Sequence, residues 1–228
     1  MNGMIGNIEV FKQNHIRIKA DGKIIHIDPF MAEQSPKDAD IILITHDHHD
    51  HFSPADIEKT ANKNTTLVVP ENIRAKAEAV KELVRETVYV KPGESYDING
   101  LEFETVPAYN TIKPFHPKKA GWVGYILKTG GKRVYIAGDT DATEEAKSVK
   151  CDIALVPVGG TYTMNAKEAA ELINEIKPEI AVPVHYGGIV GGKKDGEKFA
   201  RAVGGGVKVV IKIKARQKRR LKKQERTS

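Results

Sequence analysis

The sequence contains a single cysteine, Cys151, among 228 residues. This excludes an intramolecular disulfide and a zinc site built from cysteines. Residues 1–11 lack the continuous apolar segment of a signal peptide, and no apolar run approaches the length of a membrane span. These absences predict a protein of the reducing cytoplasm without a membrane partner. Cys151 itself is expected to be a small buried residue.

The net charge of +6 is unevenly distributed. Residues 212–226 hold nine Lys or Arg and one Glu, an excess of eight, so the rest of the chain carries about −2. The basic tail, residues 214–228, is expected to be disordered or a frayed helix, and it could attract nucleic acid electrostatically. Because the remainder is slightly acidic, we expect a small-molecule partner rather than nucleic acid. The sequence leaves homo-oligomer formation open.

Apolar residues make up 40% of the chain, which suits one sizeable domain over residues 1–213. Hydrophobic periodicity predicts many short strands with helices between them in both halves, an α/β (α+β) arrangement in which helices cover sheets. Strands are predicted over 5–11, 15–19, 23–27, 41–44, 66–69, 88–90, 101–106, 122–128, 133–137, 153–158, 180–184 and 207–213. Helices are predicted from Ser53 onward and over 71–86, 142–150, 165–176 and 193–203.

Four of the eight histidines fall in the short segment 46–51, between a buried strand and a helix cap. Residues two apart in an extended chain point the same way, so His46 and His48 can face one metal ion. The turn toward the helix can bring Asp50 and His51 to a second position, while His49 faces away. Imidazole and carboxylate groups are the ligands that Zn²⁺ prefers, and Mn²⁺ is the alternative.

This segment reads H-x-H-x-D-H, and so resembles the signature of the metallo-β-lactamase superfamily. Two later stretches add to the resemblance: Ala-Gly-Asp-Thr, with Asp139, and Pro-Val-His-Tyr-Gly, with His185. The sequence is most similar to the small Zn-dependent hydrolases related to the ascorbate-6-phosphate lactonases. The resemblance covers about residues 5–213 and implies a four-layer αββα sandwich with metals at the sheet edges.

The resemblance also implies a ligand set for one or two divalent ions. His46 and His48 would hold the first ion, and Asp50, His51 and His185 the second, with Asp139 between them. Two such ions lower the pKa of a shared water and produce a hydroxide nucleophile.

The sequence departs from the family where the first ion should receive a third histidine. Asn110 stands at roughly that position, and His116 follows six residues later. Asparagine is a weak neutral ligand, so we treat ligation by Asn110, ligation by His116 and a vacant position as open alternatives.

Several residues receive further roles. Asp28 would orient a ligand histidine. Lys113 and His116, in a basic loop, would bind a phosphate or carboxylate of the substrate. Catalytic roles are assigned to Asp50 at the metal cluster and to Tyr186, whose hydroxyl would stabilise oxyanion charge.

The predicted function is hydrolysis of a small ester, lactone or phosphate-bearing substrate by a metal-bound hydroxide. The alternatives are a metal-dependent nuclease or phosphodiesterase, and a metal-binding module without catalysis.

Overall fold

The computed structural model describes residues 3–213, so the basic tail 214–228 lies outside the described residues. Strands of the first half form one mixed sheet, in which β1 to β3 are antiparallel and β3 to β6 are parallel. Its strands follow one another in chain order: β1 (Ile8–Val10), β2 (Ile16–Ala20), β3 (Lys23–Ile27), β4 (Ile41–Leu43), β5 (Thr66–Pro70) and β6 (Glu86–Val90).

A second sheet is built from the rest of the chain, in the order β13-β12-β11-β10-β9-β8-β7. Strands β7 to β10 pair antiparallel, and β10 to β13 pair parallel. The bounds are β7 (Ser95–Ile98), β8 (Leu101–Pro107), β9 (Val123–Thr129), β10 (Lys132–Ile136), β11 (Ile153–Pro157), β12 (Ile180–Val184) and β13 (Lys208–Val209).

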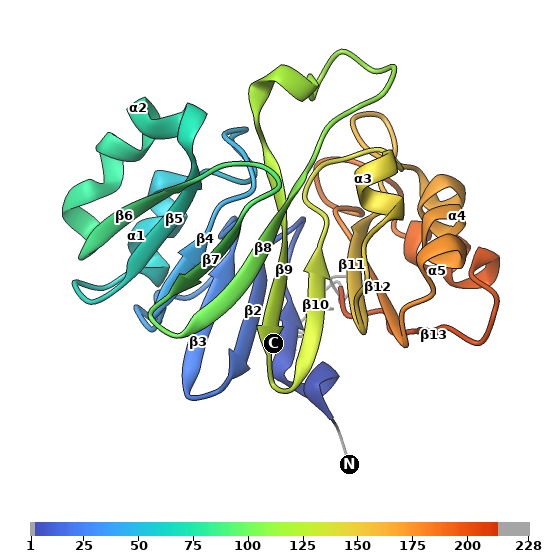
Figure 1. Cartoon of the computed structure of the whole chain (residues 1–228), viewed down its shortest axis with the longest axis horizontal. Coiled ribbons are helices and arrows are strands. Elements are labelled where there is room, and N and C mark those ends of the chain that lie inside the picture. Colours follow the sequence, from blue (N-terminus) through green and yellow to red (C-terminus); the bar gives the residue numbers. More distant parts are fainter. Residues whose placement is uncertain (1–2, 214–228) are drawn as a thin grey trace, which may run out of the picture.

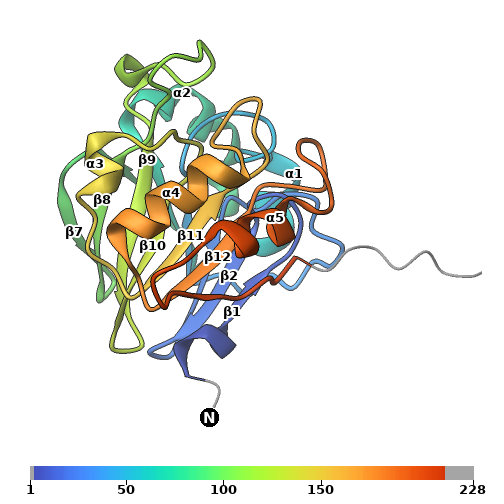
Figure 2. The ribbon, with the colours of Figure 1, turned by 90° about the vertical axis from the view of Figure 1, so that its right-hand side faces the viewer.

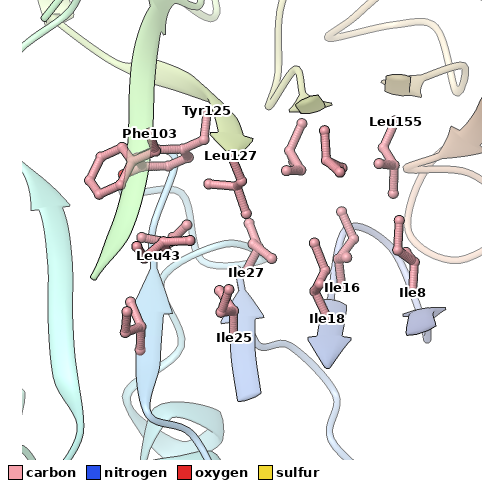
Figure 3. Packing of buried hydrophobic residues seen from close by; sticks show 14 of the residues in the cluster. Ile8, Ile16, Ile18, Ile25, Ile27, Leu43, Phe103, Tyr125, Leu127 and Leu155 are labelled. Carbon is pink, nitrogen blue, oxygen red and sulfur yellow. The ribbon is translucent and has the colours of Figure 1, made fainter. Parts of the chain in front are cut away.

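The largest core cluster lies between the two sheets. Alternation along β2 buries Ile16 and Ile18 while Lys19 is exposed, as expected for a strand with one face in the core. Across the interface, Leu127 and Leu155 of the second sheet lie opposite Ile27 and Ile8 of the first (Figure 3). Burial of such side chains contributes about 1.5–3 kcal/mol each, so this interface is the main source of the fold's stability.

Helices cover the outer faces of both sheets (Figure 1). The first sheet is covered by α1 (Pro54–Thr60), α2 (Arg74–Ala77) and the following 3-10 turn Glu78–Leu83, over a second apolar cluster. The second sheet is covered by α3 (Glu144–Lys147), α4 (Ala166–Ile176) and α5 (Asp195–Ala202), over a third cluster (Figure 2). The predicted α/β architecture with an αββα layering is therefore confirmed.

Most predicted elements are present, and some have different bounds. The helix predicted over 71–86 is broken into 3-10 turns around α2, and its last residue, Glu86, instead begins β6. Residues 5–7, predicted as the start of a strand, instead belong to a 3-10 turn over Met4–Asn7. Strand β7 was not predicted. The predicted helix caps are confirmed at Ser53, whose hydroxyl accepts from Asp56 N, and at Asn165, which forms a capping box with Glu168.

The carboxyl ends of several strands converge on one edge of the molecule. The loops after β3, β4, β8, β10 and β12 all leave at this edge, which is the upper side in Figure 1. Loops at the carboxyl ends of sheet strands commonly carry functional groups on a rigid scaffold. No helix among residues 3–213 is long and apolar enough to cross a membrane.

Candidate metal centre

The histidine-rich loop that follows β4 is fixed by backbone contacts at both ends. The Tyr125 hydroxyl donates to Ile44 O at 2.6 Å, and Val123 N donates to Thr45 O at 3.1 Å. A tight turn closes the loop, with His51 N and Phe52 N donating to His48 O. These contacts hold the loop against the core, with His46 and His51 buried and His49 exposed.

Three groups of three side chains lie with their ligand atoms within 4.8 Å of one another. Two of them share no residue, and the third, His46, His51 and Asp139, links those two. His46, His48 and His116 form the first group, with His46 Nε2 at 3.1 Å from His48 Nδ1. The second group consists of Asp50, His51 and His185, with His185 Nε2 at 3.2 Å from His51 Nε2 and 3.3 Å from Asp50 Oδ2. The structure thus brings together side chains up to 139 residues apart in sequence, from His46 to His185.

Asp139 lies between the two groups. Its Oδ1 is 3.3 Å from both His51 Nε2 and His185 Nε2, and its Oδ2 is 3.4 Å from His116 Nε2. Gly138 allows this approach, because a Cβ there would meet the Thr45 side chain and the Val123 carbonyl at 3.1 Å. Burial alone would raise the pKa of Asp139, but His185 and His51 outweigh it and hold that pKa well below its usual range.

Asp28, at the end of β3, orients His51 as predicted. Its Oδ2 lies 2.7 Å from His51 Nδ1, and the carboxylate also accepts from Thr45 N, Thr45 Oγ1 and Asn14 Nδ2. All four contacts are buried. Because a carboxylate only accepts, His51 Nδ1 carries the proton and Nε2 is left as the ligand atom.

His116, rather than Asn110, completes the first group. Asn110 Oδ1 lies 3.0 Å from His116 Nδ1, while its Nδ2 donates to Asp141 Oδ1 and Tyr162 O. These donors fix the orientation of the amide, so Asn110 Oδ1 accepts a hydrogen bond from His116 Nδ1 and leaves His116 Nε2 facing Asp139. Asn110 is thus a positioning residue. Because His116 is only 1% exposed and its Nε2 lies 3.4 Å from Asp139 Oδ2, the geometry favours a ligand role over the predicted substrate-binding role.

The pKa values of the loop histidines differ with their surroundings. Burial, with a contribution from His51, lowers the pKa of His46 well below its usual value, and burial also lowers that of His48. Burial acts the same way on His51, but the carboxylates of Asp139 and Asp28 outweigh it and raise its pKa. Histidines with lowered pKa values are neutral at pH 7, which is the state that binds metal.

Three contributors to the site were not predicted. Gln13 Nε2 lies 3.4 Å from Asp50 Oδ2, and its backbone carbonyl accepts from His185 N, which holds His185 at a φ of 58°. Asn14 contacts Asp28. The Trp122 ring lies 5.0 and 4.9 Å from the His46 and His48 rings and covers the first group.

The remaining predicted residues lie outside the two groups. Tyr186 packs in the apolar cluster under α5 with its hydroxyl against Gly196, because the backbone turn at His185 directs it away from Asp139. The proposed oxyanion role of Tyr186 is therefore not supported. Lys113 Nζ is 2.6 Å from Asp141 Oδ1. His49 faces away, as predicted, with a side chain 78% exposed. Cys151 is only partly buried.

Comparison with known proteins agrees with this geometry. A sequence profile described as the beta-lactamase superfamily domain matches residues 7–185. The chain is 34% identical over 212 residues to a UPF0173 metal-dependent hydrolase of Methanopyrus kandleri, covering 85% of this chain and 91% of that protein. It is 33% identical over 205 residues to another from Pyrococcus abyssi, covering 83% and 88%.

Solved structures show the same fold. A crystal structure from Parabacteroides distasonis, 33% identical, superposes with a TM-score of 0.75 and covers 91% of this chain and 93% of that one. Igni18, a metallo hydrolase from Ignicoccus hospitalis, is 24% identical with a TM-score of 0.72, covering 90% and 93%.

The chain belongs to the beta-lactamase superfamily. Over most of its length it is similar to the UPF0173 metal-dependent hydrolases, which confirms the predicted superfamily and the general class of metal-dependent hydrolase.

Proposed function

We propose that this chain is a two-metal hydrolase of a small ester, lactone or phosphate-bearing substrate. His46, His48 and His116 would hold the first ion, and Asp50, His51 and His185 the second, with Asp139 between them. One observation carries the proposal: these seven side chains, from four separate stretches of chain, converge with their ligand atoms a few ångströms apart.

The donor atoms fit divalent ions in both spacing and chemistry. Tetrahedral ligands 2.0–2.1 Å from Zn²⁺ are separated by about 3.3 Å. The contacts between ligand atoms of the cluster measure 3.1 to 4.0 Å. His116 Nε2 and Asp139 Oδ1 are buried with no hydrogen-bond partner among residues 3–213, although buried polar atoms are normally paired. An ion held by the first group would satisfy His116 Nε2, and an ion held by the second group would satisfy Asp139 Oδ1.

The ligand set supports Zn²⁺, with Mn²⁺ as the alternative, because imidazoles outnumber carboxylates. Bound ions of this kind would polarise a water molecule and the carbonyl or phosphoryl oxygen of the substrate.

The protein's own residues prepare the site. Asp28 and Asn110 orient His51 and His116, and Gln13 holds the Asp50 carboxylate. Burial would raise the pKa of Asp50, but contacts with His185 and His51 lower it, so the group is ionised at neutral pH. With Oδ2 in the second group, Asp50 Oδ1 is left to accept a hydrogen bond from the attacking water and orient it. This is the catalytic role that we propose for Asp50.

A cytoplasmic location and a small-molecule partner are also part of the proposal. The location rests on the single cysteine of the sequence.

The test is turnover by protein loaded with Zn²⁺ or Mn²⁺ against p-nitrophenyl esters, lactones, bis-p-nitrophenyl phosphate and thioesters. We expect metal-dependent hydrolysis of an ester or lactone that falls about 100-fold or more in Asp139→Asn, while His49→Ala retains it. Turnover of the phosphodiester alone would favour a nuclease. A loaded protein that is inert toward every substrate would overturn the enzymatic proposal.

A further inference from the structure

Large apolar side chains are exposed around the first ligand group. Seven large hydrophobic residues are exposed in the described part of the chain, and three of them are Ile112, Phe115 and Tyr162, which we call the apolar rim. Ile112 is 94% exposed. Exposed apolar side chains that gather beside a functional site are typical of surfaces that bind a ligand or partner.

The two loops that carry the rim are fixed to each other and to the metal centre. The Phe115 and Tyr162 rings meet edge to face with centroids 4.7 Å apart. Asn110 Nδ2 donates to Tyr162 O at 2.9 Å, and Asn110 also orients His116, the residue after Phe115. Phe115 and Tyr162 are thus tied to a proposed ligand, and Ile112 lies between Thr111 and Lys113, which both contact Asp141. Figure 1 shows the loop between β8 and β9 extending beyond the strand ends, beside the loop between β11 and α4.

Two of the three lysines in this loop are paired with carboxylates. Lys113 pairs with Asp141 at 2.6 Å, and Lys118 pairs with Glu145 at 2.7 Å. The Lys118 contact helps to lower the pKa of Glu145 to about 2, so that pair is fully charged at neutral pH. A phosphate on the substrate would have to compete with these carboxylates. Apart from the exposed Lys119, the surface that remains for recognition at this side of the site comes from the apolar rim.

We infer that the apolar rim binds an acyl or aryl group of the substrate, which makes the substrate class hydrophobic esters or lactones rather than sugar phosphates. This inference rests on the proposed function. In the reaction, the acyl carbon gains a bond to the water oxygen and loses its bond to the alcohol oxygen. The products are a carboxylate, a proton and the alcohol, and no other reactant is needed.

The experiment compares kcat/KM for p-nitrophenyl butyrate and p-nitrophenyl octanoate in the Zn²⁺-loaded full chain. Each fully buried methylene can raise kcat/KM up to about fourfold, so four partly buried ones predict a preference for octanoate of about tenfold or more. We expect Ile112→Ser to reduce this preference several-fold. The triple variant Ile112→Ser, Phe115→Ser, Tyr162→Ser should bring it close to one.

The matched control is Ile211→Ser. Ile211 is 44% exposed and lines a cavity of about 790 Å³ with Phe11 and Met31, away from both loops. This variant should keep the wild-type preference. Calorimetric binding of octanoate, the product anion, adds a readout that does not depend on turnover, and it should weaken in Ile112→Ser but not in Ile211→Ser.

The outcomes separate the two proposals. If the wild type hydrolyses both esters with equal kcat/KM, the inference that the apolar rim binds an acyl group is wrong, and the proposed hydrolase function stands. No turnover of any substrate in the panel, together with octanoate binding that is lost in Ile112→Ser, would overturn the hydrolase while supporting binding of an acyl chain at the apolar rim. If Ile112→Ser dissociates an oligomer in light scattering without changing the ester preference, the rim is a contact between copies and the inference is wrong.

Discussion

The Nδ1 atom of His116 lies 3.0 Å from the Oδ1 atom of Asn110, and this contact decides which nitrogen of His116 can bind a metal. The amide of Asn110 is held by its own donors to Asp141 and Tyr162. Asn110 therefore acts on the metal centre through His116 without being a ligand itself.

Replacing Asn110 should weaken only the first metal position. Asn110→Ala leaves His116 without its orienting acceptor, and we expect Zn²⁺ affinity at this position to fall about 10–100-fold with the second unchanged. Asn110→His should act in the same direction, because it removes the contacts with Asp141 and Tyr162. Chelator competition measures both affinities, with the exposed Asn72→Ala as control. Tighter binding in Asn110→His would show that position 110 ligates directly.

Replacing Asp28 should weaken metal binding at the second position, because Asp28 orients His51. Asp28→Asn replaces one acceptor oxygen with a donor group facing His51 Nδ1 or Thr45, and we expect about a 10–100-fold loss of affinity at the second site. Because Asp28 is fully buried, Asp28→Ala should also lower the free energy of unfolding by about 1–3 kcal/mol. Chelator competition and urea unfolding measure the two effects, with the exposed Asp97→Asn as control. Equal loss at both metal positions would indicate general unfolding.

The lowered pKa of His15 should make the metal-free protein less stable at pH 5 than at pH 7. Burial, with a contribution from His26, lowers the pKa of His15 from 6.5 to about 3. Between these values the unfolded chain takes up a proton that the folded chain does not, so stability falls as pH falls. One such group changes the free energy of unfolding by about 2 kcal/mol between pH 7 and pH 5.

Urea unfolding in the presence of chelator measures this dependence. His15→Leu should show a shallower loss of stability between pH 7 and pH 5 than wild type, and the exposed His49→Leu should keep the wild-type dependence. Parallel curves for wild type and His15→Leu would contradict the assignment.

The sequence alone predicted those site residues that lie close together along the chain. His46, His48 and His51 lie within six residues, between a strand and a capped helix, so their convergence needs little tertiary information. Strand periodicity likewise predicted β3 and β12 with the observed bounds. One further signal was present but was not used: Asn99-Gly100, both at positive φ, forms the tight hairpin that pairs β7 with β8.

The remaining features depend on contacts that periodicity does not encode. The choice between Asn110 and His116 is made by a loop containing Pro114 and Pro117, whose path is set by Asp141 and Tyr162 from other elements. Gln13 reaches Asp50 across 37 residues through a turn with no distinctive pattern. Tyr186 adjoins a proposed ligand in sequence, yet the left-handed backbone at His185 sends its ring to the opposite side.

The most direct test of the account is the metal content of purified protein, measured by mass spectrometry after saturation with Zn²⁺ and removal of free ion. We predict two ions per chain in wild type and in His49→Ala, and one in both His116→Ala and His185→Ala. The double variant should retain neither ion. Two ions in either single variant, or fewer than one in wild type, would contradict the two-site centre.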